Sequence, residues 1–220
     1  MTTRRRAVRQ HELTFRAWGG SRKGAGRKRA SIRPRVPHVE RQRLDARTPL
    51  HVTLRVREGL PSLRRGLVRS RVLSAFGEGR ERFGFRLNQF SIQSNHVHLI
   101  VEADDRRALS RGMKGIAVRV ARTLNRLWRR RGSVFSDRFH ARPLRTPREV
   151  RSALVYVLQN ARHHGLRLMG VDPYSSGPWF DGWRQGIVLG SGGPATWART
   201  WLLREGWRRH GLIGIQESPG

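Results

Sequence analysis

The chain has 220 residues, of which 46 are Lys or Arg and 15 are Asp or Glu, giving a formal net charge of +31. Its length suits one domain of ordinary size with tails, and its charge favours a polyanionic partner, nucleic acid before others. The absence of cysteine excludes disulfides and thiolate metal sites. Neither a secretory signal nor a membrane-spanning run is visible, so we expect no membrane partner and a cytoplasmic, nucleoid-associated location.

Residues 1–48 are rich in Arg, Gly, Ser and Pro and lack an apolar period, which predicts a basic arm that buries no core. Within it, Gly19–Lys28 (GGSRKGAGRK) resembles the glycine-flanked cationic hooks that lie in the DNA minor groove. A solvated tail fits the same composition. The DNA-binding candidates in the arm are Arg22, Lys23, Arg27 and Lys28.

Residues 49–165 show the strand and helix patterns of a folded α+β domain. In chain order we expect a strand at Leu50–Val56, a helix at Leu63–Phe76, a hairpin of strands Phe83–Ile92 and Asn95–Glu102, a helix at Arg107–Trp128, a weaker strand at Val134–Leu144 and a helix at 147–164. Thr146-Pro-Arg-Glu149 is a capping-box pattern for the last helix, and Gly165 suits its end. This order predicts a ferredoxin-like split βαβ antiparallel sheet with an appended helix.

Residues 166–220 contain five of the seven tryptophans, spread among glycines and arginines. We interpret them as an irregular accessory segment that packs on the domain or on DNA.

His96 and His98 are two residues apart on a predicted strand, so their side chains share one face. Two imidazoles on one face can bind one metal ion, although such a pair also occurs as a structural or solvated feature. On the capped helix, Tyr156 and Asn160 are four residues apart and therefore adjacent on a polar stripe. A tyrosine followed by an amide one turn later can present a phenolate and an oxygen ligand to one phosphate. An exposed tyrosine on a polar face would show the same pattern.

Five motifs in order resemble the single-tyrosine, His-x-His transposases of the IS200/IS605 type, and especially their REP-associated tyrosine transposase relatives. They lie between about His51 and Gly165, and they are HVTLR at 51–55, NHVHL at 95–99, MKGI at 113–116, RF at 138–139, and YVLQN at 156–160 ending in HHG at 163–165. The resemblance implies that Tyr156 is the nucleophile and that His96, His98 and Asn160 bind a divalent metal, Mg²⁺ or Mn²⁺. It also adds Lys114 and Arg138 to the DNA-binding candidates.

The resemblance further implies cleavage and rejoining of single-stranded or hairpin DNA through a 5′-phosphotyrosine intermediate, by a homodimer. The chain departs from the family where relatives often have Met-Pro for Gln93-Ser94, Tyr for Phe139, His for Leu158 and Pro for Ala161. The missing histidine could alter metal or phosphate contacts. A non-catalytic nucleic-acid binder and a nuclease that uses water remain as alternatives.

Overall fold

The computed structural model describes residues 44–218. Its elements are β1 (Leu50–Arg55), α1 (Gly66–Gly79), β2 (Glu81–Arg82), β3 (Phe85–Ile92), β4 (His96–Ala103), α2 (Arg106–Leu127), β5 (His140–Pro143), α3 (Pro147–His163), the 3₁₀ turn η1 (Gly177–Trp179), α4 (Trp201–Arg204) and the 3₁₀ turn η2 (Gly206–His210). No helix within residues 44–218 is long and apolar enough to cross a membrane.

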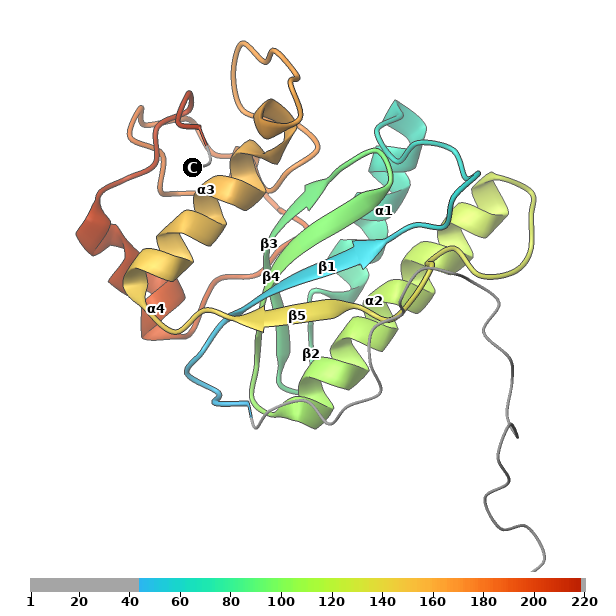
Figure 1. The fold of residues 1–220 in the computed structure, drawn as a ribbon, viewed down its shortest axis with the longest axis horizontal. Coiled ribbons are helices and arrows are strands. Elements are labelled where there is room, and N and C mark those ends of the chain that lie inside the picture. Colours follow the sequence, from blue (N-terminus) through green and yellow to red (C-terminus); the bar gives the residue numbers. More distant parts are fainter. Residues whose placement is uncertain (1–43, 219–220) are drawn as a thin grey trace, which may run out of the picture. The chain divides into compact units, whose positions relative to one another are not determined.

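The strands form one sheet in the order β2-β3-β4-β1-β5, and every neighbouring pair is antiparallel (Figure 1). Without the short edge strand β2, this is the order of a ferredoxin-like split βαβ unit. The expected α+β fold with an appended helix is therefore confirmed.

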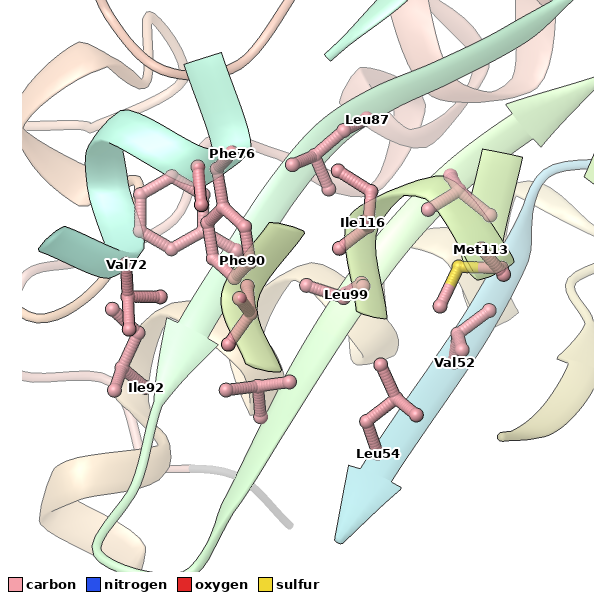
Figure 2. Packing of buried hydrophobic residues seen from close by; sticks show 14 of the residues in the cluster. Val52, Leu54, Val72, Phe76, Leu87, Phe90, Ile92, Leu99, Met113 and Ile116 are labelled. Atoms are coloured by element: carbon pink, nitrogen blue, oxygen red, sulfur yellow. The ribbon is translucent and has the colours of Figure 1, made fainter. Parts of the chain in front are cut away.

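The two faces of the sheet bury different sets of side chains. Alternate residues of β1, β3 and β4 pack against α1 and α2, with Leu99 and Phe90 facing Phe76 and Ile116 in a continuous apolar core (Figure 2). The opposite face meets α3, and Ile100 of β4 belongs to this second core. The histidines of β4 therefore lie on the α3 side.

Residues 166–218 complete the second core, where Phe180, Trp183 and Trp207 pack against the buried side of α3. An ion pair also holds this segment, because the Arg64 guanidinium lies 2.8 Å from the Asp172 carboxylate. The segment therefore packs on the sheet and α3, which is one of the two roles expected for it.

Three local features differ from the expected elements. The helix expected from Leu63 begins at Gly66, because the Leu63 N–H donates to the Ser94 carbonyl and anchors the connection to the β3–β4 hairpin. The strand expected from Phe83 is broken by a two-residue turn, in which Phe83 and Gly84 have φ of 49° and 77°, as a type I′ hairpin turn requires. This turn pairs β2 with β3. The last strand is shorter than expected and spans only β5.

The ends of α3 follow the sequence pattern. Thr146 caps the first turn by accepting from the Glu149 N–H, while the Glu149 carboxylate accepts from the Arg145 N–H. At the other end, the Gly165 and Leu166 N–H groups donate to the Arg162 and Ala161 carbonyls, which is the Schellman arrangement. Both ends of the helix that carries Tyr156 are therefore fixed locally.

Candidate active site

Two neighbouring strands present histidines on the face that α3 covers. His96 and His98 of β4 point to this face because Val97 fills the core on the other side. On β1, His51 and Thr53 share the same face, and Thr53 pairs with His98 in register. His98 Nδ1 lies 3.1 Å from His51 Nε2 and 3.2 Å from Thr53 Oγ1.

The two β4 imidazoles turn their Nε2 atoms toward each other. His96 Nε2 and His98 Nε2 are 2.9 Å apart, while His96 Nδ1 lies 2.8 Å from Asn95 Oδ1. Each ring thus has its Nδ1 held by a neighbour, an arrangement that orients metal-binding histidines in general. The spacing also suits a shared ion, since two ligands at right angles with bonds of about 2.1 Å lie about 3 Å apart.

Tyr156 lies against His98 and His51. Its half-buried ring is edge-on to His98, with a centroid distance of 5.1 Å, and to His51 at 5.7 Å. The structure therefore brings together the tyrosine and the histidines that the sequence separates by about 60 residues.

Asn160 follows Tyr156 by one helical turn and is fully buried. Neither its Oδ1 nor its Nδ2 has a hydrogen-bond partner among the described residues, although buried amides are normally bonded. The residues one turn before and one turn after it contact the histidine pair: Tyr156 contacts His98, and His164 contacts His96 at 5.9 Å between ring centroids. The amide of Asn160 thus lies in the stretch of α3 that faces the pair.

His51, His163 and His164 belong to this cluster, although sequence reasoning gave them no role. The His163 ring lies 5.9 Å from Tyr156 and 5.6 Å from His164. His51 shares the alternation of β1 with Thr53, but only the pairing of β1 with β4 shows which histidine it contacts. The available signals were the motifs HVTLR, which contains His51, and HHG, which contains His163 and His164.

Burial keeps the strand histidines uncharged at neutral pH. Desolvation, followed by the positive charge of Arg142, lowers the pKa of His51 to about 4. Desolvation, followed by the neighbouring His164 and Arg55, lowers the pKa of His96 to about 4. Desolvation, followed by the surrounding histidines, lowers the pKa of His98 to about 3. Neutral imidazoles keep a lone pair for a metal ion or a proton.

The donor set fits a divalent ion. Among residues 44–218 there is no group of three or more His, Asp or Glu that could hold a metal, so an ion held by the pair would have to take a further ligand of another type. The amide of Asn160, which has no hydrogen-bond partner among the described residues, offers a neutral oxygen one helical turn after Tyr156. Two imidazoles with an amide oxygen and water suit hard or borderline ions such as Mg²⁺ or Mn²⁺.

The structure describes two of the six predicted DNA-binding cations, Lys114 and Arg138. Arg22, Lys23, Arg27 and Lys28 lie outside the described residues. Lys114 is exposed on α2, which covers the opposite face of the sheet. Arg138 is exposed just before β5.

Comparison with known proteins points to one family. A family model described as "Transposase IS200 like" matches residues 47–159, just over half of the chain. A solved structure described as the REP-associated tyrosine transposase bound to a REP hairpin has a similar fold, with a TM-score of 0.52 and 16% identity over 64% of this chain and 82% of that chain. No curated protein sequence matches. The matched residues include His51, His96, His98 and Tyr156.

Proposed function

Because the chain belongs to the IS200-like transposase family, we propose that it cleaves and rejoins DNA strands with Tyr156 as the nucleophile. The observation that carries this proposal is the Tyr156 ring lying 5.1 Å from the His98 ring. One helical turn later lies the buried Asn160 amide, which has no hydrogen-bond partner within residues 44–218. A nucleophile beside oriented imidazoles is the arrangement that covalent catalysis on a phosphate needs.

In the proposed step the Tyr156 Oη atom attacks a DNA phosphorus. A bond forms between Oη and phosphorus as the phenol gives up its proton, and the bond from phosphorus to the 3′ oxygen breaks. The leaving 3′ oxygen takes up one proton, so the step neither gains nor loses protons. The products are a 5′-phosphotyrosine link and a 3′-hydroxyl. Since one phosphodiester is exchanged for another, the free energy of the broken bond is conserved in the phosphotyrosine link. A 3′-hydroxyl can therefore later attack that link and rejoin a strand.

His96, His98 and Asn160 would hold the divalent ion, Mg²⁺ or Mn²⁺. When bound, such an ion polarises the scissile phosphate and offsets charge that develops during attack. His51 and Thr53 hold His98 Nδ1 and so keep its Nε2 directed toward His96. We assign His51 as a positioning residue for this reason.

The proposed substrate is single-stranded or hairpin DNA. The solved transposase of similar fold is bound to a REP hairpin, and a phosphate in an unpaired strand is accessible to in-line attack. The excess of positive charge supplies binding to the backbone. The homodimer remains a prediction. The arm of residues 1–48 and the cations Lys114 and Arg138 remain proposed DNA contacts.

The decisive experiment looks for a covalent protein–DNA species. Wild-type protein, Mn²⁺ and labelled hairpin DNA should give a product that is retarded in denaturing electrophoresis and released by protease. Tyr156→Phe removes only the attacking oxygen and should abolish the product. Tyr174→Phe is the matched control, because the Tyr174 ring packs under the Arg64 guanidinium at 4.3 Å, away from the histidines.

Each outcome separates the proposal from its alternatives. Cleavage without an adduct in any variant would indicate a nuclease that uses water. DNA binding without cleavage, equal in wild type and Tyr156→Phe, would indicate a non-catalytic binder. An adduct that persists in Tyr156→Phe and disappears in Tyr174→Phe would overturn the assignment of the nucleophile.

A further inference from the structure

A pocket of about 370 Å³ lies beside α2, away from the histidine and tyrosine cluster. Its volume is in the range of ligand sites, roughly 300–1,000 Å³. It is bounded by the last residue of α1, by the β2–β3 turn and by α2, and its lining consists of arginines, glycines and Phe83. Because α2 and α3 cover opposite faces of the sheet, the pocket and the cluster are separate sites.

The lining is cationic and contains no carboxylate. Its charged groups are Arg82 and Arg111, which are exposed, and Arg119, which is half-buried. Within residues 44–218 none of these three guanidinium groups has an ion pair, and α2 contains no Asp or Glu. The nearby carboxylates of Glu81 and Asp104 are paired with other arginines, Arg199 and Arg86. The pocket therefore suits an anion, which arginine binds with its planar fork.

Two glycines leave room for the Arg119 side chain. A Cβ added at Gly115 would lie 3.0 Å from Arg119 Nη1, and one added at Gly79 would lie 3.7 Å from Arg119 Cδ. The side chain therefore lies along the surface of α2, with its guanidinium beside Gly115. Arg111, Gly115 and Arg119 follow one another at intervals of four residues, so they share one stripe of the helix. Both arginines of this stripe line the pocket.

Phe83 adds an aromatic ring that the fold itself does not need. Its side chain is 79% exposed, and its φ of 49° places it at the first central position of the type I′ turn. That position favours Asn, Asp or Gly, and other side chains are strained there. Neither the exposure nor the backbone of Phe83 favours the folded state, and such an outlier points to a function. An exposed ring beside three arginines offers a surface on which a nucleobase stacks.

We propose that this pocket binds one nucleotide of an unpaired DNA strand, with its phosphate against the three arginines and its base on the Phe83 ring. That the strand is DNA rests on the proposed function, whereas the pocket rests on its own charge and shape. A duplex hides the faces of its bases in the stack, so the exposed ring favours an unpaired strand. Since the pocket lies across the sheet from Tyr156, the nucleotide that it binds is not the one that is cleaved.

The test measures the affinity of the full chain, in EDTA to prevent cleavage, for a short labelled dT strand and for a strand of the same length without bases. Arg111→Gln should weaken binding of both strands about 10-fold, as expected for a lost charge-assisted hydrogen bond to phosphate. Arg122→Gln is the matched control, because Arg122 is exposed on the same helix and lies outside the pocket lining. It removes the same charge and should weaken binding much less.

Phe83→Asn separates stability from binding. Asn suits the left-handed turn position, so this variant should raise Tm by about 2–4 °C. It removes the stacking surface, so its affinity for dT should fall about 5-fold or more, while its affinity for the strand without bases should equal that of wild type. Phe83→Tyr keeps the ring and should bind dT as wild type does. A more stable variant that binds less tightly excludes unfolding as the cause.

Two results would overturn the pocket: equal affinities of Arg111→Gln and Arg122→Gln, or a Phe83→Asn variant that binds dT as tightly as wild type does. The pocket and the catalytic proposal also fail separately. A Tyr156 adduct together with a silent Phe83→Asn would reject the nucleotide pocket alone. Binding that depends on Phe83, in a protein that forms no adduct, would reject the catalytic proposal alone.

Discussion

Replacing Asn160 by leucine should stabilise the metal-free protein while removing its response to metal. The side chain is fully buried and both amide atoms lack partners among the described residues. An unsatisfied buried polar group costs about 1–3 kcal/mol, and leucine has a similar size without polar atoms. We therefore expect a gain of about 1–3 kcal/mol in the free energy of unfolding, or about 2–4 °C in Tm for each kcal/mol.

Metal should offset most or all of this difference between the two proteins. If Asn160 is a ligand, Mn²⁺ at about 100 times its Kd stabilises wild type by about 2.7 kcal/mol, and Asn160→Leu gains much less. The assay is thermal unfolding with EDTA and across a Mn²⁺ titration. A variant that is less stable than wild type in EDTA, or that keeps the full Mn²⁺ shift, would refute the reasoning.

Gln159→Leu is the matched control on the same helix. Gln159 is also a buried amide, but its Nε2 donates to the Gly214 and Ile215 carbonyls at 3.0 and 2.7 Å, and its Oε1 accepts from Arg162. Its replacement leaves these groups without their bonds and should cost about 1–3 kcal/mol. The Mn²⁺ shift should remain. In EDTA, Asn160→Leu should therefore raise the free energy of unfolding, whereas Gln159→Leu should lower it.

Three other predictions concern the cluster and the charge. His51→Ala should weaken Mn²⁺ affinity about 10–100-fold, because His51 orients His98. Calorimetric titration measures this affinity, and an unchanged value would contradict the positioning role. In EDTA the free energy of unfolding should fall between pH 7.5 and 5, because His51 binds a proton below about pH 6.5 in the unfolded chain, whereas its pKa in the folded protein is about 4. For His51 the loss at pH 5 is about 2 kcal/mol. A free energy from urea unfolding that does not change across this range would contradict the direction of the pKa shift. The logarithm of the single-strand binding constant should fall with the logarithm of salt concentration with a slope of about −0.7 per phosphate contact, and a constant that does not change with salt would rule out the electrostatic origin of binding.

The sequence is most informative where local patterns decide the structure. Thr146 and Gly165 set the ends of α3 by local hydrogen bonds, and Pro147 is its first residue, as expected. The two-residue period places His96 and His98 on one face for the same local reason. These features depend on neighbours in the chain, so one sequence suffices to predict them.

What depends on pairing between distant segments was not predictable. The contact of His51 with His98 follows from the register of β1 and β4, 47 residues apart. The bulge at Asn88 has no sequence signature, and the type I′ turn places Phe83 at a φ that a bulky side chain rarely adopts. The burial of Asn160 also escaped prediction, because its position on the stripe with Tyr156 suggested a solvated face.

The attachment of α3 to residues 206–217 has a consequence for protein engineering. The family match ends at residue 159, within α3, yet Arg151 and Gln159 on this helix are bound by Glu217 and by the Gly214 carbonyl. A fragment cut at the boundary of the family would lose the cover of Trp183 and Trp207 and expose the apolar side of its own helix to solvent. Chimeras that exchange target preference between related proteins should therefore be joined before residue 44 and should carry α3 and residues 166–217 as one unit.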